Sequence, residues 1–380
     1  GVLLVGGGIV SFVAWNWEAL PAAAKLALIG GAMVAAHLAG HWLWRVRGTS
    51  PRLGHALTFL GTLIFGANIG LVAQIFHLHS DATKGIGAWA AGASVAAWAL
   101  RSVPNALLAV GLGTGWACSF VSQHEGVLPF TPVLLGAVFL PLARLERSRL
   151  LLCAAFLGIA ITAAFHAGAE SDEAAAVFAS LLALDALFLS LPSALPPESE
   201  GARFATPAAR LALAAWVVVV YLASFREIAD GIGFGDLAPG TWGWAGIAAP
   251  ALLGALAATA AGLRRGAQAW TDPWSPFLPV GGTALLLLVM AIPGPGVGVT
   301  IAANAILAAF AILLLASAVR SLERGPFWLG VVLAGVLVQS RFFEYETGLL
   351  LKAIVFVACG IAVLTVGLAF ERRVREAALA

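Results

Sequence analysis

Charged residues are scarce in this chain of 380 residues. They make up 11% of it, whereas a soluble globular domain carries about 25%. Apolar residues account for 61%, and the mean hydropathy is +0.96. This composition excludes an ordinary soluble fold and predicts an integral membrane protein whose first partner is the lipid bilayer. The net charge is only +2 and no basic stripe with interleaved aromatics occurs, so we expect no nucleic-acid binding.

Cysteine and the common catalytic motifs are also rare or missing. Cys118, Cys153 and Cys359 lie inside apolar runs without CxxC spacing, which argues against a disulfide framework and a zinc site. The sequence contains no GxSxG, no Walker loop and no HExxH. The chain begins without a basic segment and small-residue cleavage site, so a signal peptide is not expected. We therefore expect neither an enzyme nor a cofactor.

Apolar runs that could cross a bilayer follow one another along the whole chain. A membrane helix needs about 20 mostly apolar residues, and proline, glycine and charge clusters mark the breaks. The candidate segments are residues 1–15, 22–44, 54–76, 85–100, 104–121, 128–143, 149–166, 173–192, 208–225, 242–263, 275–292, 297–319, 325–340 and 347–370. The sequence thus predicts an all-α, polytopic membrane helix bundle of about 14 transmembrane helices.

Basic residues collect at every second junction between these segments. The basic junctions hold Arg45, Arg47, Arg52, Arg101, Arg144, Arg147, Arg149, Arg203, Arg210, Arg264, Arg265, Arg320, Arg324, Arg372, Arg373 and Arg375. Lys and Arg in short loops favour the cytoplasmic side, so we predict a multi-pass protein of the bacterial cytoplasmic (inner) membrane, N-in and C-in. The Pro- and Glu-rich cytoplasmic loop 193–207 should join an N-terminal half, 1–192, to a C-terminal half, 208–380.

Three stretches resemble one family of bacterial polytopic membrane proteins. They are "AWNWEALPAAAKLAL" (14–28), "FGANIGLVAQIFHLHSD" (65–81) and "RFFEYETGLLLKAIVFVACGIAVLTVGLAFERR" (341–373). The family is catalogued as domain of unknown function twenty-one fifty-seven and is often joined to a related one, forty-four oh-one. Phe76 replaces the tyrosine that is usual there, and His79 is additional. The resemblance implies membrane integration but no particular activity.

The third predicted helix carries an unusual number of polar side chains. Gly66, Gly70, Ala73 and His77 share one stripe, with Gln74 at its margin, and Asn68 lies on the opposite side. Both sides therefore need protein neighbours. Either this helix is central in the bundle, or it is broken near Gly66 as transporter helices are around a binding site. Asn68 and Gln74 serve either as interhelical hydrogen-bonding groups or as part of a substrate or ion site.

His77, His79 and Asp81 follow at the outer end of that helix. An extended backbone would place the three side chains on one side, as a weak candidate site for a divalent metal. A helical backbone would separate the two imidazoles and form no such site. Histidines that are satisfied separately at the membrane interface are the favoured interpretation.

Asp185 is the acid placed nearest the middle of a predicted span. An intramembrane acid is a functional hypothesis, against the alternative of a protonated or hydrogen-bonded packing residue. His37 and His41, one turn apart on the second predicted helix, could pair with it or with each other. An outer-face charge cluster, for which a solvated ion-pair network is expected, consists of Arg341, Glu344, Glu346 and Lys352.

Two functions from different classes fit these residues. In the first, the protein is a transporter or channel-like protein for a small solute, ion or lipid, with Asn68, Gln74 and Asp185 in one cavity. In the alternative, it is a non-catalytic membrane scaffold or assembly partner of an extracytoplasmic protein. A remote third possibility is an intramembrane aspartyl protease, because "GFGD" at 233–236 resembles the GxGD of those enzymes. A glycine-rich surface turn explains that tetrapeptide better.

Overall fold

Nearly all of the regular structure is helical. The computed structural model describes residues 4, 11, 21–77, 81–124, 130–171, 173–234, 244–264, 274–344 and 348–379. Within these ranges the chain forms α-helices and two short helical turns, and no strand occurs in them. The predicted all-α class is confirmed.

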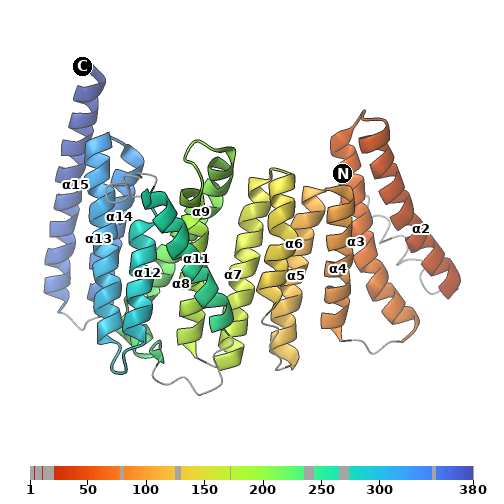
Figure 1. Ribbon diagram of the computed structural model, residues 1–380, viewed down its shortest axis with the longest axis horizontal. Helices are drawn as coiled ribbons and strands as arrows, with labels where there is room; N and C mark the ends of the chain where they lie inside the picture. The colour runs from red at the N-terminus through yellow and green to blue at the C-terminus, as the bar shows by residue number, and fades with distance from the viewer. Residues whose placement is uncertain are drawn as a thin grey trace. The chain divides into compact units, whose positions relative to one another are not determined.

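The chain divides into two compact units, residues 1–170 and 171–380. Figure 1 labels the helices in chain order. The first unit contains α2 (Ala22–His41), the π-helical turn η1 (Trp42–Val46), α3 (Pro51–Ile75), α4 (Ala82–Leu100), α5 (Val103–His124), α6 (Thr131–Leu145) and α7 (Arg149–Ser171). The second contains α8 (Ala174–Ser190), η2 (Leu191–Ala194), α9 (Glu200–Ala223), α10 (Arg226–Asp230), α11 (Ala245–Arg264), α12 (Phe277–Met290), α13 (Val297–Ser321), α14 (Arg324–Glu344) and α15 (Leu349–Leu379).

Thirteen of the fourteen predicted segments coincide with one of these helices. The first segment, 1–15, lies outside the described ranges apart from residues 4 and 11. Among the described residues, nine helices are long and apolar enough to cross a membrane. They are 22–46, 51–75, 103–123, 149–170, 174–194, 200–223, 245–264, 297–321 and 353–377. Helices α6 and α12 are apolar but shorter.

The division between the units falls between Glu170 and Ser171, earlier in the chain than the segment 193–207. That segment forms a corner within the second unit. Its second part is already helical, because α9 begins at Glu200. The hydroxyl of Ser199 accepts a hydrogen bond from the backbone N–H of Ala202 at 3.1 Å and thereby caps the new helix.

Helix α3 contacts α2, α4 and α5 within the first unit. The closest approach is between α2 and α3, where Gly40 and Gly54 face each other. A Cβ atom on Gly54 would lie 2.7 Å from the carbonyl oxygen of Gly40. On another side of α3, the indole of Trp89 fills the space next to Gly66 and donates from Nε1 to the carbonyl oxygen of Thr62 at 3.0 Å.

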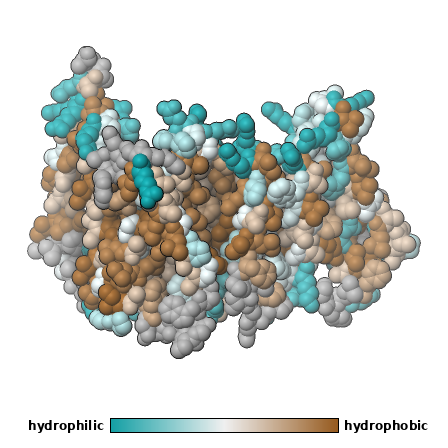
Figure 2. Space-filling view, viewed as in Figure 1, coloured by the Kyte–Doolittle hydropathy of each residue, from teal (hydrophilic) through white to brown (hydrophobic). Residues whose placement is uncertain are grey.

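Helix α8 is the most buried of the apolar spans described in the second unit. It packs against α9, α11 and α12, and buried residues occur on every side of it. Trp216 of α9 is fully buried, and its Nε1 donates to the hydroxyl of Thr283 on α12 at 2.9 Å. At the end of the chain, the rings of Phe327 on α14 and Phe370 on α15 stack with centroids 3.9 Å apart. In Figure 2 the visible sides of these helices are mostly hydrophobic.

Basic residues gather mainly at one end of each unit. In the first unit, the described corners between α2 and α3, α4 and α5, and α6 and α7 are at the same end (Figure 1), and they hold Arg47, Arg101 and Arg147. In the second unit, the corner between α13 and α14 lies at the same end as the basic end of α15. Alternate helix directions within each unit therefore agree with the alternation of basic and less basic junctions.

Candidate functional site

Asp185 is enclosed in the second unit. It lies in the second half of α8, within an apolar span, and is 1% exposed. Among the described residues, neither of its carboxylate oxygens has a hydrogen-bond partner. The next residue, Ala186, packs with Ala255 of α11 and Val280 of α12 in a core cluster. A carboxyl group is thus held in apolar surroundings without the donors that usually accompany a buried acid.

His37 is satisfied by its own hairpin. Its Nδ1 donates to the carbonyl oxygen of Met33 at 3.0 Å, since a carbonyl oxygen only accepts. Its Nε2 lies 3.4 Å from the hydroxyl of Thr62 on α3, and the ring covers Gly61. His41 is exposed. The two histidines belong to the first unit and Asp185 to the second, so the expected pairing with Asp185 stays a prediction.

Asn68 and Gln74 do not meet on α3. The amide Nδ2 of Asn68 lies 3.9 Å from the sulfur of Met33 on α2, whereas Gln74 is exposed. The interpretation of α3 as a broken helix is wrong, because it runs without interruption through Gly66 and Gly70. The other interpretation, a central position in the bundle, stays a prediction. Trp89, rather than a neighbouring backbone, uses the space that Gly66 leaves, and there is nothing within 4 Å of a Cβ built on Gly70.

His77 and Asp81 lie at the ends of two different helices. His77 follows α3 with a left-handed φ of 49° and is exposed. Asp81 is the N-cap of α4, where its Oδ1 accepts from the backbone N–H of Thr83 at 2.9 Å. His79, the third member of the candidate metal site, lies outside the described residues. No cluster suited to a metal ion occurs in the part of the chain that the structure describes.

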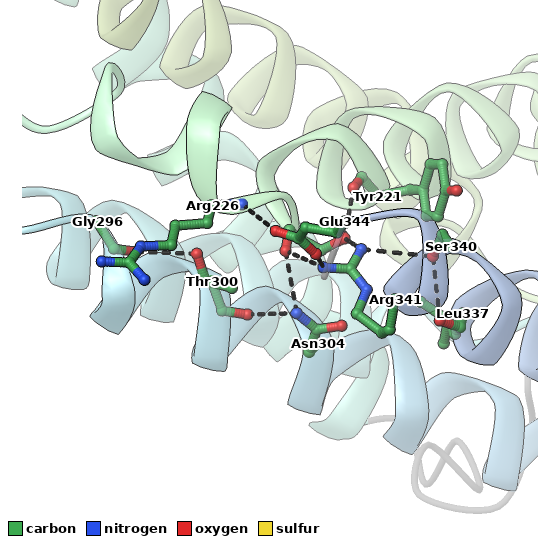
Figure 3. A network of polar contacts seen from close by, with 10 residues as sticks. Tyr221, Arg226, Gly296, Thr300, Asn304, Leu337, Ser340, Arg341 and Glu344 are labelled. Atoms are coloured by element: carbon green, nitrogen blue, oxygen red, sulfur yellow. Dashed lines mark hydrogen bonds and ion pairs between the residues drawn. The ribbon is translucent and has the colours of Figure 1, made fainter. Parts of the chain in front are cut away.

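The second polar site is the Arg341 network, drawn in Figure 3. Its members are Ser224, Arg226, Gly296, Thr300, Asn304, Ser340, Arg341 and Glu344. Asp230, which Figure 3 does not label, joins the network through Gly296. Arg341 and Glu344, three residues apart on α14, form an ion pair whose side chains are 20% and 9% exposed. The expectation of a solvated network is therefore wrong for this pair, because the end of α9 and the start of α10 supply partners that bury it. Glu346 lies outside the described residues.

The two charges of this pair are matched to the ends of two helices. The guanidinium of Arg341 donates from Nη1 to the carbonyl oxygen of Ser224, the C-cap of α9, at 2.7 Å. The carboxylate of Glu344 accepts from the backbone N–H of Arg226, the first residue of α10, at 2.6 Å. A cation at a helix C-terminus and an anion at an N-terminus both interact favourably with the helix dipole. The pair thus caps two helices at once.

Asn304 and Asp230 connect the same corner to α13. The amide Nδ2 of Asn304 donates to the carbonyl oxygen of Ser224 at 3.1 Å, and Oδ1 of Asp230 accepts from the N–H of Gly296 at 2.8 Å. A Cβ on Gly296 would overlap the backbone carbonyl of Ala229, so only glycine fits this contact. Sequence patterns did not single out these residues. The feature of the sequence that points to this corner is Asn304, a lone amide inside an apolar segment.

The tetrapeptide "GFGD" is described only in part. Gly233 and Phe234 follow α10, whereas Asp236 lies outside the described residues. Asp230, the last residue of α10, is engaged with Gly296 and lies 3.9 Å from Nε of Arg226. These contacts give Asp230 a structural role at the end of α10.

Comparison with known proteins bears on the N-terminal part of the chain. Residues 1–106 match the family described as "Predicted membrane protein (DUF2157)". The resemblance predicted from the sequence is confirmed for these residues. The match includes α2, α3 and α4 and ends soon after α5 begins, so the resemblance of residues 341–373 stays a prediction. No curated protein and no solved structure matches the chain.

Proposed function

We propose that the protein is a transporter or channel-like protein that moves a small solute or ion across the membrane along α8. The observation that supports this proposal is Asp185. Its two carboxylate oxygens are buried in an apolar span and have no partner among the described residues. Acids inside membrane spans are rare because they are expensive, and those that persist commonly mark ion or proton pathways.

The apolar surroundings of Asp185 indicate which kind of ion its carboxylate would bind. An unpaired carboxylate in a low-dielectric interior lacks both a counter-charge and hydrogen-bond donors. A bound proton would neutralise the carboxylate, and a bound small cation would supply the counter-charge. Release of that ion would leave the carboxylate free to bind another one. Three helices, α9, α11 and α12, pack around α8, and Asp185 is 1% exposed, so a ligand would reach it only when these helices move apart.

We also propose that the chain crosses the bacterial inner membrane fourteen times and has both termini in the cytoplasm. Nine apolar helices among the described residues and the basic ends of both units support it. The role is non-catalytic. The alternative is a membrane scaffold for an extracytoplasmic protein, in which Asp185 would be a packing residue that no ligand reaches.

The first prediction concerns Asp185→Asn. This variant preserves the size of the side chain but removes the titratable group. Proteoliposomes with the full chain and an internal pH-sensitive dye report proton entry when a potassium gradient and valinomycin set the voltage. We expect the wild-type protein to conduct protons and Asp185→Asn to fall to the rate of protein-free liposomes.

Ser180→Ala is the matched control, because Ser180 is equally buried on α8 but carries no charge. It should conduct as the wild type does. Vesicles without valinomycin, loaded with a sodium- or potassium-sensitive dye, are assayed with that ion outside, so that a cation other than the proton is detected. If wild-type and Asp185→Asn vesicles were indistinguishable for all three ions, the transport proposal would fail and the scaffold would be favoured.

A further inference from the structure

The corner between α2 and α3 concentrates arginine and tryptophan in a way that the transport proposal does not use. Arg45, Arg47 and Arg52 are all exposed there. No carboxylate of the described residues forms an ion pair with any of them. The nearby carboxylate of Glu146 interacts electrostatically with His55. The corner therefore presents three positive charges that form no ion pair with a carboxylate of the described residues.

Two of these arginines are stacked on indole rings. The guanidinium carbon of Arg45 lies 4.4 Å from the ring centre of Trp44, and that of Arg47 lies 4.4 Å from the ring centre of Trp42. A stacked guanidinium keeps its N–H groups at the edge of the plane, where they can donate to phosphate oxygens. Tryptophan rings in membrane proteins settle at the level of the lipid headgroups.

The backbone holds this arrangement in place. The N–H of Arg47 donates to the carbonyl oxygen of Trp42 at 2.8 Å, five residues back, which makes the turn π-helical. Trp44 also contacts the ring of His55 on α3, with centroids 3.9 Å apart. Gly48 then reverses the chain with a φ of 65°, a conformation that other residues rarely adopt. Single-turn π-helical segments are often found at functional sites.

An apolar stripe leads from the membrane interior to this corner. Val34, Leu38, Trp42 and Val46 follow one another at four-residue spacing on α2 and η1, and they are 49%, 65%, 44% and 66% exposed. Residues at this spacing share one face of a helix. A stripe of apolar side chains that ends beside stacked arginines has the layout of a phospholipid, with acyl chain below and phosphate above.

We propose that the α2–α3 corner binds an anionic phospholipid, with its phosphate on Arg45 and Arg47 and an acyl chain along the Val34–Val46 stripe. Arg52, in the first turn of α3, adds to the positive potential. The net negative charge of the lipid matters, because zwitterionic headgroups carry a cation that these arginines would repel. This surface concerns the first unit alone and is independent of Asp185.

The test measures lipid binding by the purified full-length protein in zwitterionic detergent. Phosphatidylglycerol and phosphatidylcholine are added in turn, and native mass spectrometry counts the lipids retained. The wild type should prefer phosphatidylglycerol. Each arginine near a bilayer surface contributes about 1 kcal/mol, so Arg45→Gln with Arg47→Gln should weaken phosphatidylglycerol binding by about fivefold per residue.

Matched controls separate this site from surface charge in general. Arg372→Gln with Arg373→Gln removes the same charge from an exposed helix end and should leave the preference unchanged. Arg45→Lys with Arg47→Lys keeps the charge but cannot form the planar contacts, and it should bind with intermediate affinity. Circular dichroism verifies that each variant is folded. If the Arg45→Gln, Arg47→Gln double variant does not fold, the single variant Arg47→Gln is measured in its place.

Three results would overturn the proposal. One is equal binding of the two lipids by the wild type, and another is an equal loss in the Arg372/Arg373 variant. The third is displacement of phosphatidylglycerol by millimolar inorganic phosphate, which would make phosphate itself the ligand. A lysine variant that binds like the wild type would show that the stacked geometry contributes nothing.

Discussion

At the scale of single residues, Arg341 and Glu344 differ from an ordinary surface ion pair in what surrounds them. The guanidinium of Arg341 lies 4.5 Å from the ring of Phe225, and its Nη2 donates to the hydroxyl of Ser224 at 2.9 Å. Both charges also cap helices. Removing one partner would leave the other charge buried and unpaired, which costs far more than the loss of an exposed pair.

Glu344→Gln and Arg341→Met are therefore expected to destabilise the second unit. We expect each to lower the free energy of unfolding by about 3 kcal/mol, because a buried charge loses its partner. The double variant should cost less than the sum of the two, by about 1 to 3 kcal/mol. The measurement is denaturant titration in mixed micelles.

Arg226→Ala is the control for this double-mutant cycle. Its side chain is 62% exposed, and its contact with the carboxylate of Asp230 is long. The backbone N–H that donates to Glu344 is unchanged by the substitution. We expect an effect within about 0.5 kcal/mol. If Glu344→Gln and Arg341→Met lowered the free energy of unfolding as little as Arg226→Ala does, the ion pair would be solvated rather than buried.

At the scale of elements, the hairpin of α2 and α3 depends on a pair of glycines. A Cβ on Gly40 would lie 2.7 Å from the carbonyl oxygen of Gly54, and one on Gly54 would lie 2.5 Å from Cβ of Trp44. These neighbours are backbone or near-backbone atoms, so they cannot move away without shifting a helix. The two helices approach as closely as small residues permit.

Gly54→Ala should therefore destabilise the first unit by about 1 to 3 kcal/mol, the usual cost of overpacking. Gly70→Ala on the same helix is the control, because there is nothing within 4 Å of the added Cβ. Alanine favours helix over glycine, so this control should raise stability by about 0.5 kcal/mol. Thermal unfolding in detergent distinguishes the two, and equal effects of the same sign would refute the close contact.

At the scale of the whole molecule, the basic corners predict how each unit is oriented in the membrane. These corners lie at one end of each unit, and the positive-inside rule places those ends in the cytoplasm. The three native cysteines are free, so a cysteine-free background requires only three substitutions. Exposed positions for new cysteines exist at both ends of both units.

Thr49→Cys and Glu323→Cys are predicted to react with a membrane-impermeant maleimide only in inside-out vesicles, because both positions are exposed at basic corners. Phe76→Cys and Ile292→Cys, at the opposite ends of the first and second unit, should react only in right-side-out vesicles. Mass-tagged maleimide and gel electrophoresis report each reaction. Labelling of Thr49→Cys and Glu323→Cys from opposite sides would contradict an even number of crossings between them.

The sequence alone was enough to predict the helices, because each span must satisfy its own backbone in lipid and so leaves a long apolar run. The alternation of arginines likewise predicted which helix ends lie together within each unit. The family resemblance rested on local motifs, and it is confirmed over residues 1–106.

Only the tertiary structure decided which polar side chains have partners. Helical periodicity places Asn68 and Gln74 on different sides of α3, but only the packing of α2 shows that Asn68 is half-buried beside Met33 while Gln74 is exposed. Arg341 and Glu344 became a buried cap because the end of α9 and the start of α10, more than a hundred residues earlier, lie beside them. Contacts between distant segments set burial, and burial sets what a charge costs.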